Sequence, residues 1–154
     1  DWEGDLMIFR REHGKANVAS LIERKTRYAV LFRNNDRSSK HFIAKLMNVM
    51  EPLPQTARKS ITFDRGIEFS GWRKLKPGIG TEAWFCDPQA PWQKGSVENL
   101  NKRARRYLPR DTPIAALSNH DMKVICERLN GTPRKCLGWR TPTEAFAEEL
   151  RKLR

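Results

Sequence analysis

The chain has 154 residues, of which 38% are hydrophobic and 9% aromatic, so it is long enough for one domain with a core and is not a disordered polycation. Its 30 Lys and Arg residues outnumber 18 Asp and Glu, and the net charge of +12 indicates a polyanionic partner, most simply a nucleic acid. A basic surface that serves only solubility is the alternative. No apolar run approaches the ~20 residues that a membrane span needs, so no membrane partner is expected.

The N-terminal third predicts three antiparallel strands. Residues 2–10 read as a strand, and the continuous apolar run at 6–9 is typical of a central strand covered on both faces. Residues 18–23 and 28–32 predict two more strands. Short polar links separate the three segments, which favours an antiparallel meander.

The pattern then changes to helix and strand in alternation. Ile43, Leu46, Met47 and Met50 form one apolar helical face, which Pro52 and Pro54 end. Residues 60–63 form a brief buried strand, so the strand, helix and strand predict a parallel crossover. A short helix over 69–75, closed by residues 76–78, and a fifth strand over 81–85 follow.

The last part of the chain is predicted to be helical. Residues 86–94 lack periodicity and read as a loop, and residues 95–108 form a helix with an apolar stripe of Val97, Leu100, Ala104 and Tyr107. A helix over 119–129 and a capped helix from Thr141 to Leu150 complete one mixed α/β domain that spans 1–154. Thr141 and Glu144 form a capping box with Pro142 at the first helical position.

Cysteine usage and the start of the chain indicate where the protein works. Cys86, Cys126 and Cys136 form no CxxC pair, and no signal-like segment precedes them, so reduced thiols in a cytoplasm are expected. The chain starts at Asp1 without a methionine, which predicts an excised domain.

Three acidic residues stand where strand or helix geometry holds them. Asp5 precedes the apolar run of the first strand, Asp64 follows the fourth strand, and Glu98 lies in the first turn of the 95–108 helix. If the first and fourth strands are neighbours, Asp5 and Asp64 meet at a sheet edge and the helix adds Glu98. Such carboxylates bind hard cations, and two Mg²⁺ ions about 3.5–4 Å apart support phosphodiester chemistry.

Each acid also has an ordinary structural interpretation. Asp64 suits a turn, and Glu98 suits either a helix N-terminus or an ion pair with Lys102. Rival acids are Glu3, Glu68 and Asp87, and Glu3 points to the same strand face as Asp5.

Five segments, taken in order, carry a family resemblance. They are Trp2–Leu6 (WEGDL), Ile22–Arg27 (IERKTR), Thr62–Phe69 (TFDRGIEF), Pro91–Asn101 (PWQKGSVENLN) and Lys135–Phe146 (KCLGWRTPTEAF). Together they resemble the IS30-family transposases, within the retroviral-integrase-like superfamily. The order of the segments, with 33 residues between Asp64 and Glu98, makes the resemblance specific.

The resemblance implies a ribonuclease H-like fold, with a five-stranded mixed sheet flanked by helices, and a DDE catalytic triad at Asp5, Asp64 and Glu98. It implies a transposase core that uses two Mg²⁺ ions, with Mn²⁺ as a substitute, to cut a strand and join its 3′-hydroxyl to a second DNA. Full-length members carry N-terminal DNA-binding helices, and this chain is expected to be a catalytic core without them. The expected setting is the nucleoid of a bacterial cytoplasm.

The basic residues around Glu98 have an expected role on DNA. Lys102, Arg105 and Arg106 are predicted to hold phosphates beside the metals, with Lys94 as a further candidate. Trp92 either stacks on a base or packs under its loop, and packing is the prediction. Strand transfer on two ends needs two active sites, so a homodimer or a larger assembly on DNA is expected. Two rival functions remain, a nuclease that only hydrolyses and a basic module that only binds.

Overall fold

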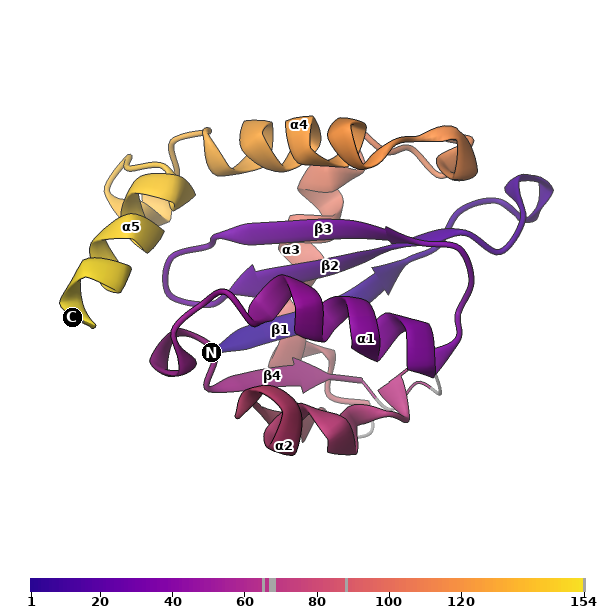
Figure 1. Cartoon of the computed structure of the whole chain (residues 1–154). Helices are drawn as coiled ribbons and strands as arrows, with labels where there is room; N and C mark the ends of the chain where they lie inside the picture. The colour runs from indigo at the N-terminus through magenta and orange to yellow at the C-terminus, as the bar shows by residue number, and fades with distance from the viewer. Residues whose placement is uncertain (65, 67–68, 88, 154) are drawn as a thin grey trace.

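A mixed five-stranded sheet forms the centre of the computed structural model, which describes residues 1–64, 66, 69–87 and 89–153. The strands lie in the order β3-β2-β1-β4-β5, so β1 is central, as its continuous apolar run predicts (Figure 1). The bounds are β1 Trp2–Met7, β2 Asn17–Glu23, β3 Ala29–Asn34, β4 Ser60–Phe63 and β5 Glu82–Phe85. The predicted meander is confirmed, since β1, β2 and β3 pair antiparallel.

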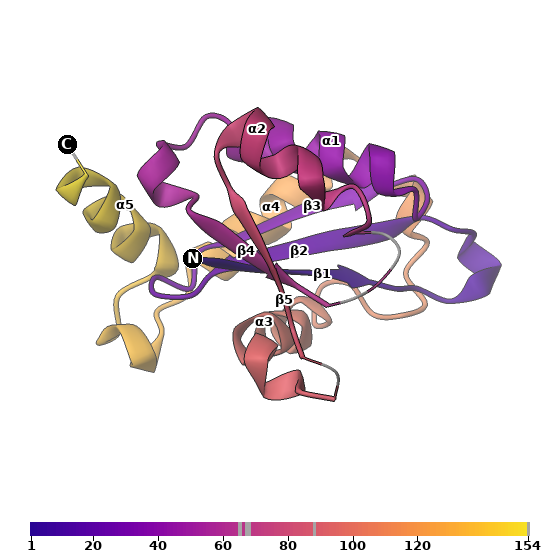
Figure 2. The same cartoon turned by 90° about the horizontal axis from the view of Figure 1, so that it is seen from below.

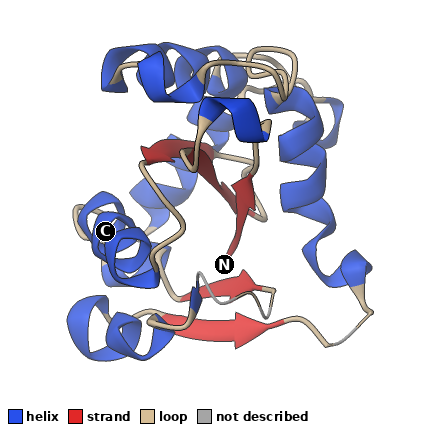
Figure 3. Ribbon diagram, turned by 90° about the vertical axis from the view of Figure 1, so that its right-hand side faces the viewer, coloured by secondary structure: helices blue, strands red, loops and turns tan. Residues whose placement is uncertain are grey.

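The helices cover both faces of this sheet and one of its edges. Helices α1 and α2 lie on one face, α3 lies on the other, and α4 runs beside β3 (Figures 1 and 2). Figure 3 shows helices on both sides of the strands, as expected for a sheet with two apolar faces. The bounds are α1 Ser39–Met50, α2 Leu75–Ile79, α3 Gly95–Ala104, α4 Asn119–Asn130 and α5 Pro142–Lys152.

The crossover from β3 through α1 to β4 makes the second half of the sheet parallel. β4 pairs parallel with β1 and with β5, which confirms the predicted crossover. Two apolar clusters result, because side chains alternate between the faces of each strand. Trp2 and Phe63 pack under α1, while Val18 and Ile22 pack under α3.

Two of the predicted helices differ from those observed. The segment 69–75 does not close at residues 76–78, because α2 begins at Leu75 and continues through Pro77 to Ile79. Proline fits there because the first turn of a helix has no internal partners for its N–H groups.

Helix α3 ends at Ala104 rather than near residue 108. The amides of Arg106 and Tyr107 bond to carbonyls three residues back, which tightens the last turn. Tyr107 is thereby turned outward, at 37% exposure, and Leu108 occupies the core position instead, at 0%.

Gly4 of β1 allows the two strands that carry Asp5 and Asp64 to pack closely. A Cβ atom at Gly4 would lie 2.9 Å from Cε1 of Phe63 and 3.0 Å from Cδ2 of Leu21. Phe63 itself is held by stacking on Phe69, with ring centroids 4.6 Å apart. The ring is therefore not free to move away.

We expect Gly4→Ala to lower the free energy of unfolding by about 1–3 kcal/mol, because an added methyl group overpacks this contact. Chemical denaturation monitored by circular dichroism measures the change. Gly95→Ala is the matched control: nothing lies within 4 Å of its added Cβ, and its φ of −59° is helical. That control should be neutral or slightly stabilising. Equal stability of Gly4→Ala and the native chain would contradict the contact.

Candidate active site

The register between β1 and β4 brings Asp5 and Asp64 together. Glu3 lies opposite Thr62 in this parallel pair. Asp5 lies two residues further along β1, and Asp64 directly follows the end of β4. Because side chains repeat with a period of two, this register directs both toward the side of the sheet that α3 covers. The sequence-predicted meeting of these two acids at the sheet edge is thus present in the fold.

Lys94 lies between the two aspartates. Its Nζ is 3.6 Å from Oδ1 of Asp5 and 3.6 Å from Oδ2 of Asp64. The Lys94 side chain is only 8% exposed, whereas those of Asp5 and Asp64 are 25% and 48% exposed. Its role as a phosphate contact stays a prediction, and in this structure its ammonium is the cation that the two carboxylates share.

The carboxylate of Asp5 is oriented by a short chain of hydrogen bonds. Nδ2 of Asn101 in α3 donates to Oδ2 of Asp5 at 3.1 Å, and the buried hydroxyl of Ser20 in β2 donates to Oδ1 of Asn101 at 2.7 Å. The Leu6 amide donates to the other oxygen of Asp5 at 2.9 Å. Burial raises the pKa of Asp5, the ammonium of Lys94 offsets part of that rise, and the nearby charge of Asp64 adds to it. A cation beside Asp5 therefore favours the ionised form of its carboxylate.

Glu98 lies on the flank of α3 that faces Asp5. Residues three apart in a helix are neighbours on its surface, so Glu98 lies one turn before Asn101, which contacts Asp5. The Glu98 side chain is exposed. Within the described part of the chain, no three His, Cys, Asp or Glu residues lie close enough to hold one metal ion. The triad of Asp5, Asp64 and Glu98 stays a prediction, of which the structure joins the first two.

The rival acids have different surroundings. Glu3 is 1% exposed and has both oxygens engaged: Oε1 accepts from the Val97 amide at 3.1 Å, and Oε2 pairs with Nε of Arg24 at 3.1 Å. Glu3 thus caps the start of α3 from β1, a role that sequence reasoning missed. Asp87 exchanges hydrogen bonds with Gln93. Glu68 lies outside the described residues.

The acidic side chain of Glu3 at the start of α3 follows a physical rule. A helix N-terminus carries partial positive charge and unpaired N–H groups, which a carboxylate satisfies. The signal in the sequence was an acid on the inward face of a central strand, where an unpaired charge is costly.

The basic residues predicted to contact DNA divide into two kinds. Lys102 on α3 and Arg106 in the turn after it are exposed. The guanidinium of Arg105 instead donates to the Ile8 carbonyl at 2.8 Å and lies over the Phe9 ring, at 4.9 Å from its centroid. Burial, helped by the charge of Arg110, lowers the pKa of Arg105. Arg105 therefore ties α3 to the end of β1.

Trp92 corrects one prediction. It was expected to pack under its loop, but its side chain is 75% exposed in the 3₁₀ turn Pro91–Lys94. The packing role is therefore wrong, and the alternative role, stacking on a base, stays a prediction.

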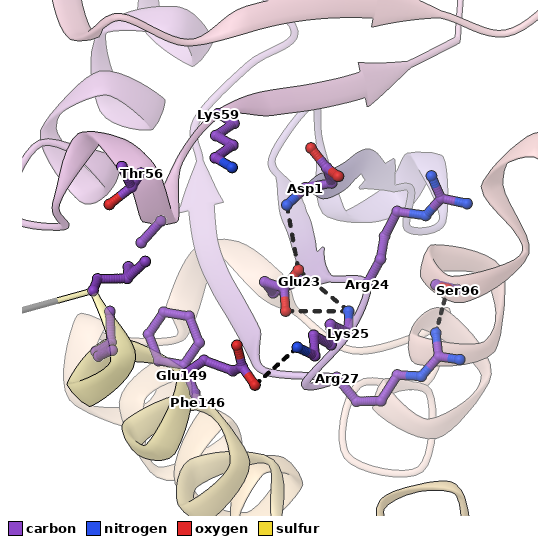
Figure 4. Close-up of a pocket in the computed structure, with 13 residues that line it drawn as sticks. Asp1, Glu23, Arg24, Lys25, Arg27, Thr56, Lys59, Ser96, Phe146 and Glu149 are labelled. Carbon is purple, nitrogen blue, oxygen red and sulfur yellow. Dashed lines mark hydrogen bonds and ion pairs between the residues drawn. The ribbon is translucent and has the colours of Figure 1, made fainter.

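A cavity of about 530 Å³ lies elsewhere, at the end of the sheet where β1 begins. Figure 4 shows Arg24, Lys25 and Arg27 from the β2–β3 turn on one side of it and Phe146 and Glu149 of α5 on the other. Neither Asp5 nor Asp64 lines it. The chemistry of the paired carboxylates thus belongs to an open surface beside α3 rather than to this cavity.

The donor set of Asp5 and Asp64 fits a hard divalent cation. Carboxylate oxygens are the ligands that Mg²⁺ and Mn²⁺ prefer, and two of them already share one positive charge here. No helix among the described residues is long and apolar enough to cross a membrane.

No family model matches the sequence, but the chain is similar to transposases of insertion sequences. The chain is 36% identical over 143 residues to "Transposase InsI for insertion sequence element IS30C" of Escherichia coli (strain K12), covering 93% of this chain and 37% of that protein. It is 34% identical over 149 residues to the transposase for insertion sequence element IS1086 of Cupriavidus metallidurans, covering 97% and 43%. The chain thus spans less than half the length of these relatives. They confirm the resemblance to IS30-family transposases that the motifs predicted.

Two solved structures of retroviral proteins have a similar fold. The crystal structure of the catalytic core domain of BIV integrase matches with a TM-score of 0.70 and 18% identity, over 98% of this chain and 95% of that one. A chain of the simian T-cell lymphotropic virus intasome, in complex with PP2A regulatory subunit B56 gamma, matches with a TM-score of 0.74 and 16% identity, over 94% and 53%. The predicted ribonuclease H-like fold of an integrase catalytic core is confirmed.

Proposed function

Because the chain is homologous to IS30-family transposases and has the fold of an integrase core, we propose that it is the catalytic core of a DNA transposase. The observation that carries this proposal is the convergence of Asp5 and Asp64 on one cation, Lys94, at the edge of two parallel strands. The substrate is DNA, namely transposon ends and a target, and the place of work is the DNA-containing cytoplasm of a bacterium. Action on two ends calls for a dimer or a larger assembly.

Asp5, Asp64 and Glu98 are the residues that would hold two Mg²⁺ ions, with Mn²⁺ as a substitute. When bound, such ions stabilise the charge that develops on phosphate and make an attacking oxygen more nucleophilic. Asn101 and Ser20 fix the direction of the Asp5 carboxylate. Glu3 fixes where α3 begins, and α3 carries Glu98.

Two displacements at phosphorus follow one another in this proposal. In the first, water attacks a phosphodiester, the bond from phosphorus to the 3′-oxygen breaks, and the products are a 3′-hydroxyl and a 5′-phosphate. In the second, that hydroxyl attacks a phosphodiester of the target, loses its proton to solvent and releases a new 3′-hydroxyl. The exposed Lys102 of α3 and Arg106, in the turn after α3, bind the backbone phosphates and so keep the reacting groups in place.

Lys94 and a metal ion carry the same sign of charge and are drawn to the same two carboxylates. We expect Lys94→Gln to respond more strongly to Mg²⁺ than the native chain does, because the variant leaves Asp5 and Asp64 to repel each other until a cation arrives. The measurement is the rise in unfolding temperature when millimolar Mg²⁺ is added. Lys94→Gln combined with Asp64→Asn is the control and should lose the rise. An equal or smaller rise in Lys94→Gln would contradict a cation site between the aspartates.

The products of the reaction distinguish the proposed function from its two rivals. A labelled duplex with a free 3′-hydroxyl end is incubated with a supercoiled plasmid, the protein and Mn²⁺. Label joined to plasmid supports a transposase, whereas nicked plasmid without joined label indicates a nuclease that only hydrolyses. DNA binding without nicking or joining indicates a basic module, and overturns the proposal.

A further inference from the structure

Three arginines from distant parts of the chain gather beside one flank of α3. Arg27 belongs to the β2–β3 turn, Arg103 to α3, and Arg134 to the segment between α4 and α5. The guanidinium of Arg27 donates to the hydroxyl of Ser96, in the first turn of α3 (Figure 4). Arg103 follows Ser96 by two helical turns and lies on the same flank. Burial lowers the pKa of the Arg134 guanidinium most, and the positive charges of Arg103 and Arg27 lower it further.

This flank is not the one that faces the aspartates. Asn101, which contacts Asp5, lies about 140° around the helix from Ser96, at 3.6 residues per turn. The exposed Lys102 occupies the arc between Glu98 and Arg103, and the exposed Arg106 follows the end of α3. A lysine therefore lies between Glu98 and Arg103 on the outside of α3.

The three guanidinium groups share no acidic partner. Among the described residues, none of the ion pairs involves Arg27, Arg103 or Arg134, although elsewhere Arg24 pairs with Glu3 and Arg140 with Glu148. All three side chains are half-buried, so their positions are constrained by neighbours. Like charges held together in this way repel one another, and an anion relieves that repulsion. The planar fork of arginine matches phosphate oxygens in two-point hydrogen bonds.

The turn that carries Arg134 is itself held in an unusual conformation. Gly138 and Trp139 both have left-handed backbones, with φ of 63° and 67°. A left-handed tryptophan is an outlier, and such strain gathers at ligand sites. Backbone bonds hold it: the Trp139 amide donates to the Arg134 carbonyl at 2.9 Å, and the Arg134 amide donates to the Arg140 carbonyl at 3.0 Å. The Trp139 side chain in this turn is 67% exposed.

We propose that Arg27, Arg103 and Arg134 bind the sugar-phosphate backbone of a DNA duplex on the flank of α3 that lies away from the aspartates. This site is separate from the catalytic carboxylates and does not depend on metal chemistry. It gives α3 two contacts with DNA, one on each flank. The arginines of this site recognise the charge and shape of the DNA backbone, so the site adds affinity for DNA without sequence preference.

The salt dependence of binding tests the site directly. The probe is a short DNA duplex of arbitrary sequence, and both proteins compared carry Asp64→Asn so that no strand is cut. Each lost phosphate contact reduces the slope of log affinity against log salt by about one. In the triple variant R27Q/R103Q/R134Q, we expect the magnitude of the slope of log affinity against log salt to fall by about three.

The matched control removes the same charge from the other face of the sheet. R37Q/K40Q/K74Q changes three exposed residues at and near α1 and α2, and should reduce the slope by less than one. An unchanged slope in R27Q/R103Q/R134Q, or an equal loss in the control, would overturn the site.

Two further variants guard against a folding defect. R27K/R103K/R134K keeps the three positive charges, so its slope of log affinity against log salt should equal that of the protein without these changes. A smaller slope in this variant at an unchanged unfolding temperature would contradict a phosphate site. If the triple glutamine variant fails to fold, the single change Arg103→Gln on α3 replaces it in the test. Its slope should be smaller in magnitude by about one. Failure of the proposed catalytic function would appear in the product assay instead and would leave these slopes unchanged.

Discussion

Asp64→Asn is expected to lower strand cleavage about 1000-fold or more while the protein still binds DNA. The metal ions that Asp64 would hold supply several kcal/mol of transition-state stabilisation, and each 1.4 kcal/mol is a factor of ten in rate. Asparagine keeps the size of the side chain and the acceptor for the Gly66 amide, which lies 2.8 Å from Oδ1 of Asp64. Loss of the reaction would therefore report on charge rather than on the fold.

Binding should persist or tighten, because the substitution removes a negative charge from a surface that meets phosphates. Nicking of plasmid in Mn²⁺ and filter binding of a duplex measure the two effects separately. Asp5→Asn and Glu98→Gln should behave in the same way. Glu127→Gln, which removes an exposed carboxylate from α4, is the control and should cleave like the native chain. Cleavage retained in Asp64→Asn or Glu98→Gln would rule out the triad.

The largest effect on stability is expected at Glu3. Glu3→Ala removes the acceptor of the buried Val97 amide. The N–H group of Val97, in the first turn of α3, is then left without a hydrogen bond. A hydrogen bond to a charged group contributes about 1.5–3 kcal/mol, so the free energy of unfolding should fall by about 2–3 kcal/mol. The pair with Arg24 adds little, because the side chain of Arg24 is 56% exposed.

Glu3→Gln provides the matched comparison for this prediction. Its amide oxygen still accepts from Val97, so the loss should be smaller than in Glu3→Ala. It should also keep the rise in unfolding temperature on adding Mg²⁺, whereas Asp64→Asn should lose it. Loss of the Mg²⁺ response in a folded Glu3→Gln protein would instead make Glu3 a metal ligand.

Much of the fold follows from local patterns in the sequence. Strand alternation, continuous apolar runs and the capping box at Thr141 and Glu144 predicted the meander, the parallel crossover and the last helix, all of which are present. Two helix ends were misplaced, because tightening of the last turn of α3 and the tolerance of Pro77 in α2 depend on hydrogen bonds that composition does not reveal.

The candidate site was predictable where strand register alone decides it. Glu3 pairs with Thr62, and Asp5 and Asp64 each follow two residues later in the chain. The prediction that the first and fourth strands are neighbours was therefore enough to bring the two aspartates close together. Lys94 was not predictable as their shared cation, because it ends a loop without periodicity. The cluster of Arg27, Arg103 and Arg134 was equally hidden, since only the folded chain brings these three residues together.

The central claim is that Asp5, Asp64 and Glu98 together bind the metal ions of a transposase core. Soaking crystals of the protein in Mn²⁺ and measuring anomalous scattering tests it most directly. The account predicts anomalous density that contacts Asp5 and Asp64, with Lys94 displaced and Glu98 turned inward to join them. A soaked crystal with no density at the two aspartates, or with density only at other acids, would contradict it.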